Sequence, residues 1–279
     1  MTMHSLTLAV ALAAASVSSA QAETVWFEVA EIETNRNQSF LVPLSNPEHI
    51  AHARALVANQ GRPTDGLGAI LIATIKPGGD GFNRDIRDPE QRLWRWHISE
   101  VEGFADFAIE LCDGWPGWVD ENPEAFIANT GGAICFWSYT VKSELAEPPT
   151  FAISEGIDGA WYNPATSGQG LYIDSLREQG KFGFAWFTWS TGAPGSSRSG
   201  EQVWWSGVGD VAGARAQVQL FASSGGAFNA PTAVQTQAVG GGEFEFVSCD
   251  QGRFVFRFNT GESGTIPLRR VVPRPGCVR

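Results

Sequence analysis

A histidine followed by two carboxylates is the first feature of this 279-residue sequence that could do chemistry. His97 comes directly after Trp96 and lies upstream of Glu110 and Asp113. If neighbouring strands bring these side chains together, the imidazole could act as a general acid or base, or bind a metal. The alternative is a histidine that makes a structural hydrogen bond at a sheet edge. The trio is therefore a candidate catalytic site for a hydrolase.

A glycine-rich acidic loop, GGDGFNRDIRD, offers oxygen atoms that would suit calcium. The candidate ligands are Asp80, Asn83, Asp85 and Asp88. Their spacing does not match an EF-hand loop, and two arginines interrupt the acidic run. A solvated acidic loop is the competing interpretation.

The turn Gly261-Glu262-Ser263-Gly264 resembles the nucleophile turn of chymotrypsin-like proteases. A serine nucleophile needs a histidine base and an orienting carboxylate. The histidines outside the N-terminal leader are His49, His52 and His97, all in the first half of the chain. A simple hairpin turn is therefore favoured, and no cofactor is expected.

Tryptophan supplies the strongest indication of binding, because an exposed indole can stack on a sugar ring or bury in a partner protein. The candidates lie beside turns or in a consecutive pair: Trp115, Trp118, Trp189, Trp204 and Trp205. Core packing is the competing interpretation for each of them. In a strand, Trp204 and Trp205 must face opposite sides of the sheet. At least one of these two rings is then covered by another layer or presented to a ligand.

The charge is unevenly distributed along the chain. Residues 23–150 hold 20 acidic and 9 basic residues, a net charge of −11, whereas residues 151–279 hold 10 of each. This acidic balance would repel a phosphate backbone, so nucleic-acid binding is not expected. The 32 Gly, 18 Phe and 11 Trp favour short aromatic strands joined by glycine turns over long helices.

The N-terminus is typical of an exported protein. Residues 5–20 are apolar or small, and Ala20-Gln21-Ala22 fits signal peptidase, so residues 1–22 are expected to be a signal peptide. No later apolar run is long enough to span a bilayer, which predicts a periplasmic or secreted protein. In an oxidising compartment the four cysteines should form disulfides, and we expect Cys112 with Cys135 and Cys249 with Cys277, although four cysteines allow three connectivities.

Two prolines in residues 144–150 mark a linker between two modules. Residues 23–143 are predicted to be α+β, one main helix packed on an antiparallel sheet. The helix begins at Ser45-Asn46-Pro47-Glu48 and ends near Asn59. The expected strands are 24–32, 40–44, 67–75, 93–98, 104–111 and 134–141.

Residues 151–279 are predicted to be all-β, with about eight antiparallel strands in a barrel or a sandwich. The expected strands are 160–163, 170–175, 182–189, 202–208, 214–221, 243–247, 253–258 and 265–269. Aromatic residues occur at both odd and even positions of the strand 182–189, so we expect it to be covered on both faces.

Both modules resemble families of exported proteins. The segments LSNPEHIAHARAL, RLWRWHISEVEGFADF, IELCDGWPGWVDENPEAF and ICFWSYTV resemble a family of secreted domains that includes cyclic-AMP-inducible proteins of social amoebae and bacterial relatives. The segments GAWYNPATSGQGLYIDSL, FGFAWFTW and SCDQGRFVF are similar to a Gly/Trp-rich β module of exported proteobacterial proteins. Where relatives of the first family commonly read C-P-W-S, this chain has Cys135-Phe136-Trp137-Ser138. These resemblances imply export and a β-rich fold but no known reaction.

Three functional hypotheses follow. The preferred one is a non-enzymatic, exported binding protein for a glycan or an extracellular protein. The second is a secreted inhibitor of an enzyme, because a helix laid on an antiparallel sheet is the plan of cystatin-like inhibitors. The third is a hydrolase that uses His97 with Glu110 and Asp113.

Overall fold

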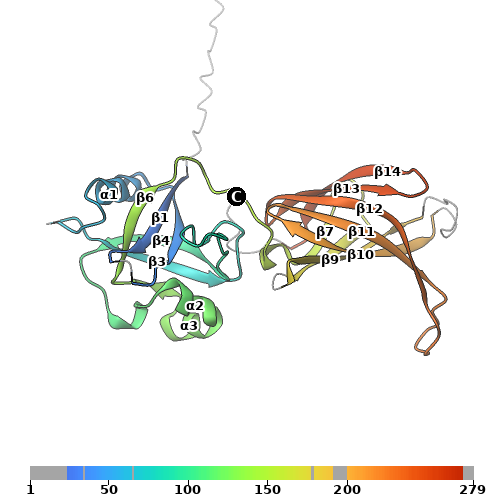
Figure 1. Ribbon diagram of the computed structural model, residues 1–279, viewed down its shortest axis with the longest axis horizontal. Helices are drawn as coiled ribbons and strands as arrows, with labels where there is room; N and C mark the ends of the chain where they lie inside the picture. The colour runs from blue at the N-terminus through green and yellow to red at the C-terminus, as the bar shows by residue number, and fades with distance from the viewer. Residues whose placement is uncertain (1–23, 34, 65, 177–178, 191–199, 273–279) are drawn as a thin grey trace, which may run out of the picture.

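The computed structural model describes residues 24–272, except for residues 34, 65, 177–178 and 191–199. Two bodies lie side by side, a mixed module at the N-terminal side and an elongated barrel after it (Figure 1). The expected signal peptide, residues 1–22, and Cys277 lie outside the described residues. The predicted fold class is confirmed, because α+β structure is followed by a closed antiparallel barrel.

The first module contains two three-stranded sheets rather than the single sheet that was expected. One has the order β2-β1-β6, with β1 (Val25–Glu31), β2 (Ser39–Leu44) and β6 (Tyr139–Glu144). The other has the order β4-β3-β5, with β3 (Ile70–Pro77), β4 (Trp96–Ala105) and β5 (Ala133–Ile134). Side chains from both sheets meet in one core, whose centre is aromatic: the rings of Phe40 and Trp96 lie 5.5 Å apart.

Three helices cover these sheets instead of one. Helix α1 (Pro47–Ala58) begins as the sequence predicts, because the Asn46 side chain accepts a hydrogen bond from the Glu48 N–H and Pro47 needs no donor there. Helices α2 (Pro116–Glu121) and α3 (Pro123–Thr130) were not predicted. Helix α3 repeats the start of α1, since Asn122 caps it ahead of Pro123 and Glu124. That repeated Asn-Pro-Glu was the signal for α3 in the sequence.

Three of the strand bounds predicted in this module are wrong. Strand β4 is continuous from Trp96 to Ala105, so the strands expected at 93–98 and 104–111 are not separate. After Ala105 the chain runs through an irregular segment into the 3₁₀ turn η1 (Glu110–Cys112). The strand expected at 134–141 is divided into β5 and β6 by a turn after Cys135. The disulfide Cys112–Cys135 joins these two irregular segments, which confirms the first predicted pairing. Cys249 is also disulfide-bonded.

All eight strands expected in the second module are present, and they close into a barrel in the order β10-β11-β12-β13-β14-β7-β8-β9. Their bounds are β7 (Gly159–Tyr162), β8 (Gly170–Leu176), β9 (Lys181–Trp189), β10 (Gln202–Ala212), β11 (Arg215–Ser224), β12 (Gln235–Ser248), β13 (Gln251–Phe258) and β14 (Ser263–Arg270). The expectation that β9 is covered on both faces is wrong. Phe182, Phe184 and Trp186 fill the barrel, but Phe187 and Trp189 are exposed on its outside.

Glycines facing aromatic rings explain the unusual composition of the barrel. Gly207 on β10 lies directly opposite Phe184 on β9, and a methyl group at Gly207 would stand 2.2 Å from the Phe184 ring. Gly252 is paired with Phe246 in the same way, and Gly264 with Phe256. In each pair the aromatic ring occupies the space that a side chain on the neighbouring strand would take. The large rings therefore fit inside an eight-stranded barrel because glycine stands opposite them.

One end of the barrel is closed by the junction between the two modules. Phe82, from a loop of the first module, packs against the barrel core, with its ring 5.4 Å from that of Phe151. The connecting segment is hydrogen-bonded on both sides, from Ala152 N–H to Gly81 O at 3.0 Å and from Ile153 N–H to Gly213 O at 2.9 Å. A residue of the first module, Phe82, thus helps to close this end of the barrel.

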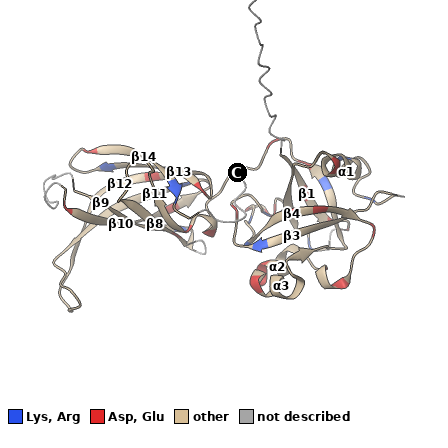
Figure 2. Ribbon diagram, turned by 180° about the vertical axis from the view of Figure 1, so that it is seen from behind, with Lys and Arg blue, Asp and Glu red and all other residues tan. Residues whose placement is uncertain are grey.

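Acidic residues are scattered over the first module, and the barrel contains charged residues of both signs (Figure 2). One cluster on the barrel is Arg215 with Glu243 and Glu245, in which Glu245 also binds Arg253. Such exposed pairs contribute little to stability individually. Within the described residues, no helix is both long and apolar enough to cross a membrane.

Candidate binding site

The end of the barrel opposite the junction is open and contains a pocket of about 410 Å³. The pocket exists because β7 is short. β7 pairs with β14 at only two positions, Tyr162 with Arg269 and Trp161 with Arg270. Beyond Tyr162 the chain leaves the barrel wall as a loop, so β14 and β8 have no strand between them there. A volume of this size falls within the range of small-molecule sites.

The floor of the pocket is aromatic. It is formed by the side chains of Trp186, Trp205, Phe256 and Phe258. These rings pack on one another, with centroids 4.9 Å apart for Trp186 and Trp205 and 4.8 Å apart for Trp205 and Phe258. Because the rings hold each other in place, they present a preformed apolar surface to a ligand.

The rim of the pocket is polar and nearly neutral. Its hydroxyl and amide side chains are Asn163, Thr166, Gln169, Thr188, Ser263 and Thr265. Two of them interact, since the Thr188 hydroxyl donates to Gln169 Oε1 at 2.5 Å. Glu262 is the one charged side chain among the described residues that line the pocket. A hydrogen bond from the Thr260 hydroxyl lowers the pKa of the Glu262 carboxyl, so the rim carries a negative charge at neutral pH.

The predicted tryptophans divide into three groups. Trp205 is in the barrel core and Trp204 is 56% exposed on the outer face, so one ring faces each side as the alternation requires. Trp189 borders the pocket and is 42% exposed. In the first module, Trp118 stacks on Trp115 with ring centroids 5.3 Å apart, and the Arg36 guanidinium covers Trp115. Only Trp189 and Trp205 of the five line a described pocket.

Sequence reasoning missed most of the other pocket residues. Phe256 and Phe258 lie in the strand predicted at 253–258 but were not singled out, and Gln169 lies in a loop whose path the sequence does not reveal. Glu262 and Ser263 belong to the turn that resembled a protease motif. That turn is a hairpin connection between β13 and β14, and it borders the pocket. The sequence does contain a signal for this wall of the pocket: alternate aromatic residues in the strand 253–258 lead into a turn that contains Glu262.

The trio around His97 is not brought together. His97 is buried on β4, and its Nδ1 lies 2.6 Å from Gly78 O, to which it donates. Glu110 is exposed on η1, and Asp113 accepts a hydrogen bond from the Trp137 N–H. No hydrogen bond or ion pair joins any two of the three in the described part of the chain. His97 thus makes the kind of backbone hydrogen bond that the structural alternative expected, to the residue that follows β3, and catalysis by the trio stays a prediction.

The side-chain oxygens of the acidic loop, residues 80–88, accept hydrogen bonds from other groups of the protein. Asp80 Oδ1 accepts hydrogen bonds from the N–H groups of Phe82 and Asn83, both at 2.8 Å. Asn83 Oδ1 accepts from Leu41 N–H, and Asp85 Oδ1 accepts from Ser39 N–H and its hydroxyl. Asp88 Oδ1 accepts from the Glu90 N–H. The loop is thereby fixed in the shape that carries Phe82 into the junction.

Burial raises the pKa of the Asp80 carboxyl, while the hydrogen bond from the Asn83 N–H and the nearby His97 act in the opposite direction. Burial likewise lowers the pKa of Arg84, and Asp80 opposes that change. Among the described residues, no three His, Cys, Asp or Glu side chains form a group that could hold a metal ion. Calcium binding at this loop stays a prediction.

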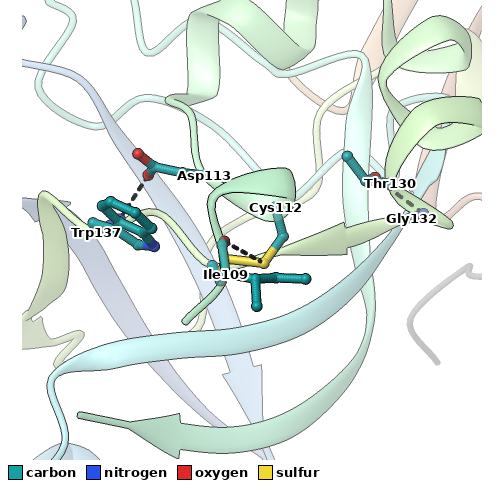
Figure 3. The surroundings of a disulfide bond; sticks show 7 residues. Ile109, Cys112, Asp113, Thr130, Gly132 and Trp137 are labelled. Carbon is teal, nitrogen blue, oxygen red and sulfur yellow. Dashed lines mark hydrogen bonds between the residues drawn. A yellow bond between two sulfur atoms is a disulfide. The ribbon is translucent and has the colours of Figure 1, made fainter. Parts of the chain in front are cut away.

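An exposed apolar segment follows β4, next to the disulfide. Phe107, Ile109 and Leu111 are all exposed, and Phe107 is 85% accessible. Figure 3 shows Ile109 beside the bridge formed by Cys112, with Trp137 held nearby through Asp113. The bridge and this hydrogen bond fix the C-terminal end of the segment.

The first module is similar to a known family of domains. Residues 23–148 match the family model of the BP-74 N-terminal domain. The matched region includes the His97 anchor, the disulfide and the loop that enters the junction. No curated protein and no solved structure shows significant similarity to the chain. The resemblance of the barrel to a Gly/Trp-rich module, and the link to cyclic-AMP-inducible proteins, stay predictions.

Proposed function

We propose that this chain is an exported, non-enzymatic binding protein and that the open end of its barrel binds a glycan. The observation that carries the proposal is the pocket itself, an aromatic floor below a rim of amide and hydroxyl groups. Export is supported by the signal-like residues 1–22 and by the cysteines, which are all oxidised where the structure describes them. A periplasmic or extracellular location would bring the pocket into contact with surface carbohydrate.

The chemistry of the pocket fits a sugar better than an apolar metabolite. A pyranose ring has C–H groups that pack on an aromatic face and hydroxyls that exchange hydrogen bonds with amides and hydroxyls. A sugar hydroxyl can add hydrogen bonds to rim groups such as Gln169 and Thr188, which already pair with each other, whereas an apolar ligand can add none. The charge of Glu262 disfavours anionic ligands, so a neutral or amino sugar is expected.

The test begins with a glycan array probed with the whole mature chain. The glycans that bind are then titrated while tryptophan fluorescence is recorded, because Trp186, Trp189 and Trp205 line the pocket. Trp189→Ala should raise the dissociation constant about tenfold, which corresponds to about 1.4 kcal/mol. Trp204→Ala is the matched control, since Trp204 is similarly exposed on the same barrel but does not line the pocket.

Two results would contradict the proposal. One is an array on which the folded chain retains no glycan. The other is equal weakening by Trp189→Ala and Trp204→Ala, which would move the binding site from the pocket to the outer face of the barrel.

A secreted inhibitor is the second candidate, and the exposed segment at residues 106–111 favours it. A protruding apolar segment braced by a disulfide can enter the cleft of another enzyme without losing much conformational freedom. Its acidic neighbours, Asp106 and Glu110, suit an enzyme with a basic rim. Inhibition of a panel of serine and cysteine peptidases by the whole chain would support this candidate, and cleavage within the segment or no effect on any of them would refute it.

A further inference from the structure

The hairpin between β11 and β12 extends beyond the barrel wall. The two strands change register between Leu220 and Phe221 and then stay paired with each other as far as Ser224 and Gln235. The resulting two-stranded arm projects away from the barrel (Figure 1). A two-stranded ribbon without a third strand or a covering layer is only marginally stable in water. The arm is therefore a feature that needs a partner surface to stabilise it.

The composition of the arm suggests the kind of surface it contacts. Residues 221–242 contain no Asp, Glu, Lys or Arg, and in Figure 2 the arm has no coloured segment. Phe228, at its tip, is fully exposed, and Val234 is more than half exposed. Solvated edges are normally protected by charged side chains, and this arm has none. Such an arm fits an apolar and uncharged acceptor.

The arm and the pocket lie at the same end of the barrel. The arm leaves where β11 ends and β12 begins, and the pocket is lined by the ends of β9 and β13 and the starts of β8, β10 and β14. In an antiparallel barrel of this strand order, all of these positions lie on one rim. A second copy placed with its open end facing the first would present its pocket to the arm of the first, and the arrangement is reciprocal.

Charge favours contact between two barrels over contact between two first modules. Residues 151–279 have no net charge, whereas residues 23–150 carry −11. Two first modules would repel each other strongly, whereas two barrels without net charge would repel each other far less. A pocket of about 410 Å³ with an aromatic floor also provides the ring faces on which a phenylalanine side chain packs.

We propose that Phe228 at the tip of the arm inserts into the barrel pocket of a second copy of this chain, so that the protein self-associates through its open barrel ends. The dimer exchanges two arms between two pockets. This inference does not rest on glycan binding, and its test contains no carbohydrate.

The experiment measures the molecular mass of the whole mature chain by sedimentation equilibrium over a wide range of concentrations. Wild-type protein should show a concentration-dependent dimer. Phe228→Ser should raise the dimer dissociation constant at least tenfold, and so should Thr265→Arg, which places a charge in the pocket mouth. Phe107→Ser is the matched control, because Phe107 is a highly exposed phenylalanine of the first module and its loss should leave association unchanged.

Mixing two variants gives the sharpest test. Phe228→Ser keeps an intact pocket, and Thr265→Arg keeps an intact arm, so an equimolar mixture should recover heterodimers that neither variant forms alone. Circular dichroism and the melting temperature establish that each variant is folded. The inference is overturned if wild-type chain is monomeric at every concentration, if Phe228→Ser associates as wild type does, or if the folded variants do not complement each other.

Discussion

The junction makes the stability of the barrel depend on a residue of the other module, and Phe82→Ala tests this dependence. Phe82 is half-buried between the modules, with its ring 5.7 Å from that of Trp26 on one side and 5.4 Å from that of Phe151 on the other. It packs with the core of the barrel, although it belongs to the first module in sequence. Truncation leaves a gap at the sealed end.

The size of the effect follows from the burial. Replacing a fully buried phenylalanine with alanine costs about 3–5 kcal/mol. Because Phe82 is only half-buried, we expect the free energy of unfolding to fall by about 2 kcal/mol. The substitution should destabilise the barrel and weaken its contact with the first module. In a unit of this size, about 2 kcal/mol corresponds to a lowering of the barrel melting temperature of roughly 4–8 °C.

Differential scanning calorimetry of the whole chain is the assay. Wild-type protein should unfold in one cooperative transition, since the connecting segment is bonded to both modules. Phe82→Ala should separate this into two transitions, with the barrel melting first. Phe107→Ala, at an exposed phenylalanine, should leave the trace unchanged. The reasoning fails if Phe82→Ala melts in a single transition at the wild-type temperature, or if wild type already shows two independent transitions.

Two further predictions concern the barrel interior and the acidic loop. Gly207→Ala should destabilise the chain by about 1–3 kcal/mol, because the new methyl group collides with the Phe184 ring. Gly183→Ala should cost less, because its methyl group would meet nothing closer than 3.8 Å. Thermal unfolding compares the two variants, and equal losses of stability would contradict the idea that Phe184 needs a glycine opposite it. For Asp80, the pKa is raised by burial in the folded state, so its contribution to stability is fully present at low pH and is lost as the pH rises through the folded-state pKa. Asp80→Asn keeps an oxygen for the two backbone N–H donors. Its urea midpoint should therefore rise relative to that of wild type when the pH is raised from 4 to 7. The same difference in midpoint at both pH values would contradict a raised pKa at Asp80.

The sequence predicts regular strands well and fails where long-range contacts override local pattern. The eight barrel strands were found because alternation and glycine turns are local signals. The segment after Ala105 has strand-like composition, but its side chains at Phe107 and Ile109 have no layer to pack on, and the chain turns toward Cys112. Helix α3 was missed although it carries the same start signal as α1, because it is only eight residues long.

The candidate site was only partly predictable for a related reason. Trp189 was selected because it lies beside a turn, and Trp205 because it is paired with Trp204. The pocket, however, depends on β7 ending early, which no local pattern shows. The acidic loop was predicted from its ligand types, and its actual contacts involve backbone groups of a distant strand. Side-chain type indicates what a residue can bind, and only the topology determines what lies next to it.

Phe82 and Phe151 close one end of the barrel, so the pocket in the described part of the chain opens only at the opposite end. A molecule that enters this pocket must leave by the same route, and a polymer could not thread through it. If the pocket binds a glycan as proposed, a chain end would therefore reach the aromatic floor more readily than a chain interior.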